Sequence, residues 1–212
     1  MTAQIVTFAR AAQADARSLP GATIAYGPGD EIYAQAEETD LIYRVTSGAV
    51  RTTRLDSDGR RQIGDFYYAG DFFGLEAGPE HRFSAEALCE SQVQVFKRAT
   101  LAMADDTAAI ERTIWTATAR ELERTREHLM MLGRKTAREK VASFLHDLAD
   151  RQGGEVQTLV MGRQDMADYL GLTIETVSRM LTQLQADGLV TFTGCRQFRI
   201  GNRQAMTRLV AA

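Results

Sequence analysis

The chain has 212 residues, 44% of them hydrophobic and 25% charged, with a formal net charge of −3, which is typical of a globular protein and unlike a disordered chain. No run approaches the roughly 18 consecutive apolar residues of a transmembrane helix, and residues 1–10 lack the basic and apolar regions of a secretion signal. Two cysteines, Cys89 and Cys195, are too few for a disulfide framework, so we expect a cytoplasmic protein with no membrane partner.

Short strand-like runs dominate the first hundred residues. Turns rich in Gly, Asp and Pro separate them, as in 27–30 and 56–59. This pattern predicts an all-β sandwich or jelly-roll barrel. We expect an N-terminal β-roll domain over residues 1–100, in a chain of the α+β class. The predicted strands are 23–26, 41–45, 50–55, 62–68 and 93–96, and Cys89 is expected to lie in a strand as a small core residue.

Residues 101–132 contain no Gly or Pro and predict one long helix. A second apolar stripe, formed by Ile110, Ile114 and Ala117, is expected to face the barrel. Since a helix with two apolar stripes has two surfaces to cover, we favour a dimerisation helix over one that packs only on its own barrel, although two threonines weaken the seam. The a/d seam consists of Trp115, Thr118, Leu122, Thr125, Leu129 and Leu132.

Gly133 is expected to interrupt this helix and to act as a hinge. A further amphipathic helix is predicted over 136–151. The C-terminal domain is expected to span residues 133–212. Its predicted helix has an apolar side made of Val141, Phe144, Leu145 and Leu148.

Residues 162–189 predict a helix-turn-helix. The first helix is expected over 163–170, where Gly171 adopts the left-handed conformation that ends it. Thr173 caps a second helix that runs to about residue 187 and ends at Gly188. Within this motif Ala167 is small where the helices cross, Leu172 fills the corner, and the buried face of the second helix comprises Val177, Met180, Leu181 and Leu184.

The opposite face of the second helix carries Ile174, Glu175, Ser178 and Arg179, which we expect to reach base edges in the major groove. Arg179 suits guanine O6 and N7, Glu175 suits a cytosine amino group, and Ser178 suits either role. The alternative is an ordinary helical hairpin with a surface ion pair between Glu175 and Arg179. Residues 133–212 carry 11 Lys and Arg against 8 Asp and Glu, whereas residues 1–132 carry 14 against 20. This charge distribution, together with the caps and the glycine turn, favours double-stranded DNA as the partner.

Residues 189–193 and 197–200, joined by 194–196, predict a β-hairpin wing. Cys195 in its turn has two open interpretations: an inert loop cysteine, or a redox switch whose oxidation would place negative charge against DNA. The switch fails if peroxide weakens DNA binding equally in the wild type and in Cys195→Ser. The residues expected to contact the DNA backbone are Thr173, Thr182, Arg163, Arg196 and Arg199.

The order of β-barrel, long helix and winged helix-turn-helix, together with the run 175–179 and the glycine-rich run 70–74, resembles the Crp/Fnr regulators from about residue 22 to 200. The resemblance implies a homodimer that binds a TTGA–N6–TCAA-like palindrome and contacts RNA polymerase. It also implies that Arg179 reads the guanine, Glu175 its complementary side, and Ser178 the region of the outer thymines. The chain is most similar to the FixK branch, which implies activation in low-oxygen or nitrogen-fixation control, and this similarity lies in 57–62, 73–76, 81–87 and 169–173.

Cyclic-nucleotide binders of that family carry Gly-Glu and then Arg-Ser/Thr-Ala. Here Leu75 follows Gly74, and Phe83 separates Arg82 from Ser84. A displacement of one residue on a strand turns a side chain to the opposite face, so we predict no cyclic-nucleotide binding.

Residues 1–30 contain no cysteine for an iron–sulfur cluster. The three histidines have no metal-ligand spacing, and His81 is expected in a surface loop, so we predict neither metal nor cofactor.

Three other functions compete with this prediction. An enzyme is disfavoured because phosphate-loop and Ser/His/Asp signatures are absent from the sequence. A ligand-gated regulator or repressor of the same fold would use the barrel to sense a small molecule. A dimer that contacts only proteins would show no DNA affinity.

Overall fold

The computed structural model describes residues 21–102 and 107–211. Residues 1–10, where the absence of a secretion signal is expected, lie outside the described residues. Contacts between residues divide the chain into two compact units, one ending at Arg124 and the other starting at Thr125. Within the described ranges, no helix combines the length and the apolar character needed to cross a membrane.

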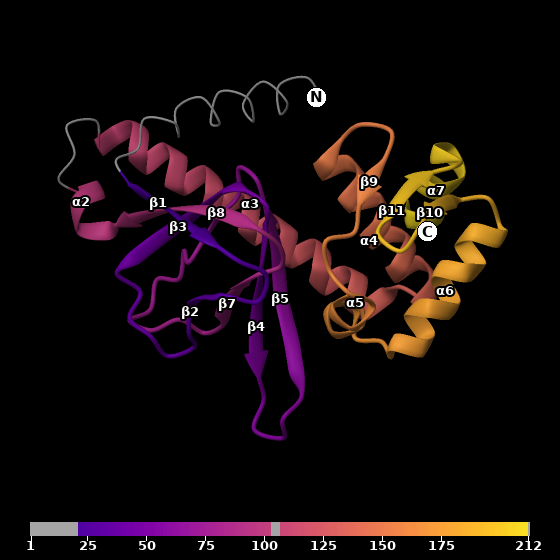
Figure 1. The fold of residues 1–212 in the computed structure, drawn as a ribbon, viewed down its shortest axis with the longest axis horizontal. Coiled ribbons are helices and arrows are strands. Elements are labelled where there is room, and N and C mark those ends of the chain that lie inside the picture. The colour runs from indigo at the N-terminus through magenta and orange to yellow at the C-terminus, as the bar shows by residue number, and fades with distance from the viewer. Residues whose placement is uncertain (1–20, 103–106, 212) are drawn as a thin grey trace. The chain divides into compact units, whose positions relative to one another are not determined.

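The first unit contains a β-sandwich of antiparallel strands (Figure 1). One sheet has the order β1-β8-β3-β6 and the other the order β2-β7-β4-β5. Strands far apart in sequence are therefore neighbours, as a jelly-roll requires, and the predicted barrel architecture is confirmed. The strands are β1 (Ala22–Tyr26), β2 (Glu31–Tyr33), β3 (Leu41–Ser47), β4 (Ala49–Leu55), β5 (Arg61–Tyr68), β6 (Phe72–Phe73), β7 (Ser84–Ala87) and β8 (Ser91–Lys97).

The five predicted strands match β1, β3, β4, β5 and β8. The sequence prediction missed β2, β6 and β7, because strands of two to four residues carry too little alternation to be recognised. The placement of Cys89 in a strand is wrong. It is a half-buried residue in the turn between β7 and β8, where its Sγ lies 3.9 Å from Ser91 Oγ.

Strand β3 is buried on both faces, which explains its continuous apolar sequence. Tyr43 and Val45 point into the sandwich, where they pack with residues of the second sheet such as Val50 and Tyr67. Ile42, on the other face, packs with Phe72, Phe96, Leu101 and Ile110. The first unit therefore has one core between its sheets and another between a sheet and its helices.

Helix α2 (Arg98–Ala102) belongs to the first unit, and helix α3 (Thr107–Arg134) begins in the first unit and ends in the second. The single helix predicted over 101–132 is therefore described from Thr107 onward, and residues 103–106 lie outside the described residues. The predicted stripe is confirmed, since Ile110 is buried in the second core and Ile114 and Ala117 pack against it.

The predicted interruption of the helix at Gly133 is wrong, because α3 continues through it to Arg134. A glycine inside a helix costs only about 1 kcal/mol relative to alanine, and the neighbouring Met131 is buried. Packing of the last turn therefore outweighs the weak helix preference of this single residue.

The second unit contains a three-stranded sheet of order β10-β11-β9 and a set of helices. Helix α4 begins with a capping box, in which Thr136 and Glu139 satisfy each other's backbone N–H groups. Strand β9 and helix α7 were not predicted from the sequence. The elements are α4 (Ala137–Gln152), β9 (Gln157–Thr158), α5 (Arg163–Leu170), α6 (Ile174–Ala186), β10 (Val190–Thr193), β11 (Gln197–Ile200) and α7 (Arg203–Ala211).

Candidate nucleic-acid interface

Helices α5 and α6 form the helix-turn-helix within the boundaries predicted for them (Figure 1). Gly171 has φ 61° and ψ 43°, the left-handed conformation that ends α5, and its N–H donates to Ala167 O. Thr173 Oγ1 accepts from the Thr176 N–H at 3.3 Å and caps α6. Gly188 has φ 70° directly after the Asp187 C-cap. Local sequence signals therefore determine the end of α5 and both ends of α6.

The two helices are held together by a small apolar contact surface. Ala167 is completely buried, as its position at the crossing requires, and Val177, Leu181 and Leu184 are buried on α6. Met180, which we expected on the buried face, is only half-buried, because it lies at the edge of the stripe. Most of the opposite face of α6 is exposed.

The predicted base-reading residues lie on that opposite face. Glu175 and Arg179 are exposed, and Ile174 is 38% exposed. Hydrogen bonds from the Glu175 backbone N–H and from the Thr173 side chain hold the pKa of Glu175 below its usual value. The carboxylate at the start of α6 is therefore charged at neutral pH and oriented by the helix N-terminus.

Ser178 differs from its neighbours on α6 because it already has a protein partner. Its Oγ accepts from Arg163 Nη1 at 3.0 Å, and its side chain is half-buried. No motif in the sequence indicated this bond between α5 and α6. Among the described residues, Glu175 and Arg179 form no ion pair with each other, and both side chains are exposed.

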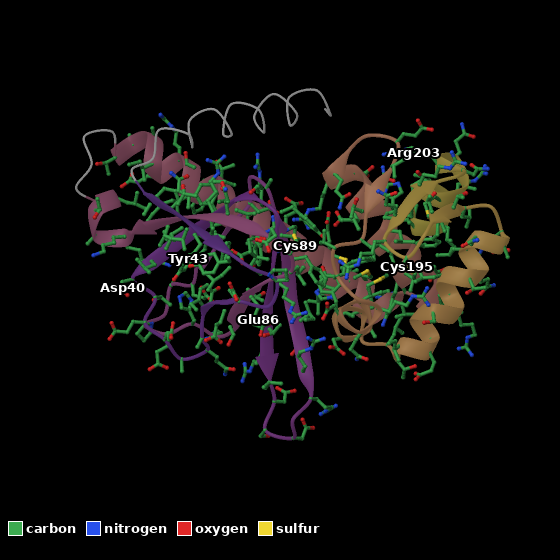
Figure 2. The ribbon with its side chains drawn as sticks, in the orientation of Figure 1. Asp40, Tyr43, Glu86, Cys89, Cys195 and Arg203 are labelled. Carbon is green, nitrogen blue, oxygen red and sulfur yellow. The ribbon has the colours of Figure 1, made fainter. Side chains whose placement is uncertain are left out.

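The wing lies next to this motif and contributes basic residues. Strands β10 and β11 pair over Val190–Thr193 and Gln197–Ile200, as predicted, and β9 adds a third strand. Arg196 and Arg199 are exposed, as is Cys195, which Figure 2 labels. The turn thus presents cations and a thiol to solvent.

A hollow of about 370 Å³ between the two helices and the wing brings several predicted backbone contacts together. Arg163 from α5, Thr182 from α6 and Arg196 from the wing line it, and so does Cys195. Gln185 lines it as well and was missed, although its position three residues after Thr182 places it on the same helix face. Thr173 and Arg199 are not part of this lining.

Helix α3 exposes a row of large apolar side chains. Trp115 is 75% exposed, Leu122 49% and Leu129 69%. Thr118 and Thr125 between them are exposed as well. Large exposed apolar side chains at seam spacing indicate a surface that another molecule covers. The last seam residue, Leu132, is half-buried and packs near Gly171, so it also belongs to the second unit's interior.

The barrel residues that correspond to a nucleotide cassette are engaged inside the barrel. The expectation that His81 lies on the surface is wrong: its ring is 2% exposed and stacks on Tyr33 at 3.7 Å. Its Nδ1 lies 3.2 Å from Glu76 Oε2, and Ser84 Oγ accepts from the Gln35 N–H at 2.9 Å. Within the described ranges, no three His, Cys, Asp or Glu side chains gather as a metal site would require.

The sequence and the fold of this chain were compared with known protein families, curated proteins and solved structures. Residues 23–104 match the model of the cyclic nucleotide-binding domain, and residues 139–209 match that of the Crp-like helix-turn-helix domain. The nitrogen fixation regulation protein FixK of Azorhizobium caulinodans is 43% identical, over 95% of this chain and 87% of that protein. The transcriptional activator protein FnrL of Cereibacter sphaeroides is 33% identical, over 81% and 73%. The structure of FixK2 from Bradyrhizobium japonicum matches with a TM-score of 0.86 and 45% identity, over 92% of this chain and 99% of that one.

Proposed function

The chain belongs to the Crp/Fnr family of DNA-binding transcription regulators, and we propose that it binds a TTGA–N6–TCAA-like palindrome as a homodimer and activates transcription through RNA polymerase. Since similar proteins carry the name of nitrogen fixation regulators, we propose low-oxygen or nitrogen-fixation control in the cytoplasm. In this proposal residues 1–100 form the sensor-like domain, 101–132 the dimerisation segment and 133–212 the DNA-binding domain.

The exposed polar face of α6 carries this proposal. Glu175 and Arg179 stand one helical turn apart, on the face opposite to Val177 and Leu181. In this motif the N-terminal part of the second helix enters the major groove. Arg179 supplies the bidentate donors that guanine accepts, and the ionised Glu175 accepts from cytosine. The backbone contacts follow from the hollow beside α6, since Arg163, Thr182 and Arg196 converge there.

We also propose that the protein binds its operator without a cofactor or a cyclic nucleotide. The carboxylate of Glu76 and the hydroxyl of Ser84 already have protein partners. Gly74 packs so closely that a Cβ there would lie 2.8 Å from the Tyr43 ring. The carboxylate of Glu76 and the hydroxyl of Ser84 therefore serve the barrel's own contacts, whereas Arg82 is exposed.

The proposal is tested by titrating a labelled TTGA–N6–TCAA duplex, without added ligand, at physiological salt. We expect Arg179→Ala to weaken binding by about 1–3 kcal/mol, because it loses a bidentate base contact. Arg208→Ala is the matched control, since it removes an exposed arginine of the same unit from α7. A wild-type protein that binds a scrambled duplex equally well would contradict the proposal.

A further inference from the structure

The C-terminus of α5 is completed by side chains from outside the helix-turn-helix. The last carbonyls of a helix have no intrahelical partner. The N–H groups of Gly171 and Leu172 both return to Ala167 O, so they do not reach the later carbonyls of Tyr169 and Leu170. These two receive donors from neighbouring helices.

His128 of α3 supplies the first of these donors, with its Nε2 2.8 Å from Tyr169 O. Because a carbonyl oxygen only accepts, Nε2 carries the proton. Lys140 Nζ of α4 supplies the second, 3.2 Å from Leu170 O. Cationic or N–H side chains at a helix C-terminus satisfy its carbonyls and complement its dipole.

The face of the same histidine ring makes a second contact. It stacks on the Tyr169 ring with centroids 3.9 Å apart and an interplanar angle of 11°, and Phe144 of α4 packs edge-on against that tyrosine at 5.8 Å. Leu132, one turn later on α3, lies 3.7 Å from the point that a Cβ on Gly171 would occupy. The end of α3 therefore contacts the end of α5 through a hydrogen bond, a ring stack and an apolar contact.

We propose that His128 is a positioning residue that holds the helix-turn-helix at a fixed angle to α3 and thereby sets the half-site spacing that the dimer accepts. This rests on the proposed function, in which α3 forms the dimer seam and the two recognition helices read a palindrome. His128 directly precedes Leu129, a seam residue that is 69% exposed. A single turn of α3 therefore carries both a residue of the dimer surface, Leu129, and the contact of His128 with Tyr169 of α5, which we call the His128 clamp.

In this proposal the His128 clamp determines the distance between half-sites that the dimer prefers, and it does not determine which bases each half-site contains. In dimeric helix-turn-helix proteins, the distance between half-sites reflects the fixed geometry between the two recognition helices. His128 is remote in sequence from the base-reading residues of α6 and contacts α5 instead. Its loss therefore loosens the preferred spacing, whereas the preferred half-site sequence is unchanged.

Two variants separate the contributions of this side chain. His128→Phe keeps a ring against Tyr169 but loses the donor, and His128→Gln keeps a donor but loses the ring. Glu127→Gln, at the exposed preceding position, is the matched control. Each protein is titrated with palindromic duplexes whose spacer is unchanged, one base pair shorter or one base pair longer.

We expect His128→Phe to bind the unchanged spacer about fivefold more weakly, because the Tyr169 carbonyl loses its donor. It should lose much less on the altered spacers, so that its spacing preference falls, and His128→Gln should recover part of that preference. Glu127→Gln should behave as the wild type. Uniform weakening on all spacers, with the wild-type preference retained, would overturn the proposal.

A measurement on the free protein tests the contact between His128 and α5 without relying on any operator sequence. Amide hydrogen exchange over residues 163–172 of the free protein should be faster in His128→Phe than in Glu127→Gln, because α5 loses its external cap. Equal exchange would overturn the proposal. If the wild type shows no preference for the six-base-pair spacer, the proposed operator fails and not the clamp, and the spacing series is repeated on a palindrome selected from random DNA.

Discussion

The barrel and the start of helix α6 satisfy their polar groups in different ways. In the barrel unit, partners are distant in sequence: Arg51 bonds Glu86 across 35 positions and Arg124 bonds Asp65 across 59. The start of α6 is satisfied locally, since Thr173 caps an amide three residues later. The barrel therefore uses distant polar partners to hold its own fold together, whereas α6 is capped by a residue of its own first turn and exposes Glu175 and Arg179.

The polar groups that join the barrel to α3 differ from those on α6 in how far their own fold engages them. Tyr67 Oη donates to Glu121 at 2.9 Å, and burial raises the pKa of Glu121 above its usual value, although this hydrogen bond acts against the shift. The Tyr67 hydroxyl of the barrel is thus already bonded to a carboxylate of α3. The exposed Glu175 and Arg179 have no comparable long-range partner among the described residues, so a duplex can take them without breaking an internal contact.

The largest predicted effect tests the long-range part of this comparison. Arg124 lies 2.9 Å from Asp65, 3.8 Å from Asp71 and over the Tyr67 ring, with 21% of its side chain exposed. We expect Arg124→Ala to lower the free energy of unfolding by about 3 kcal/mol, because it leaves carboxylates without their cation. Urea unfolding followed by circular dichroism measures this loss. Arg126→Ala, at an exposed position of the same helix, is the control, and an equal loss in both would refute a special role for Arg124.

The contrast between local and distant partners also determines what the sequence could predict. The boundaries of α5 and α6 were predicted because Gly171 and Thr173 act within one turn of the chain. The strands of the barrel were predicted from alternation, but the pairing of β1 with β8 and of β7 with β4 is not encoded locally. Three short strands were missed because two to four residues carry too little alternation to be recognised.

Individual residues were misplaced where a distant partner decides their environment. His81 was expected on the surface, yet it is buried and stacks on the ring of Tyr33 in strand β2, 48 positions earlier in the sequence. The bond that Arg163 donates to Ser178 from fifteen positions away was likewise not predicted, while the base-reading role of Ser178 stays a prediction. Helix α7 was missed because its burial depends chiefly on Met206, which is a weak signal in the sequence. Assignment of the base-reading residues themselves stays a prediction until binding is measured.

A smaller effect tests the local part of the comparison. Thr173→Ala removes the side-chain cap of α6, and we expect it to lower the free energy of unfolding by about 1 kcal/mol. Thr182→Ala is the matched control, because its hydroxyl donates to Ser178 O within α6 and caps no helix end. Thermal or urea unfolding compares the two variants. If both lose the same amount, the helix does not depend on its local cap.

The smallest effect separates backbone contacts from base contacts within the DNA-binding unit. Arg196→Gln removes one exposed cation from the wing turn, and each phosphate contact contributes about 0.9 to the slope of log affinity against log salt concentration. We expect that slope to become shallower by about one, with equal weakening on the operator and on a scrambled duplex, because phosphates carry no sequence information. Arg208→Gln, which removes a charge from α7, should leave the slope nearly unchanged. A loss confined to the operator would instead place Arg196 among the base-reading residues, and the wing would then share the role that we assign to α6.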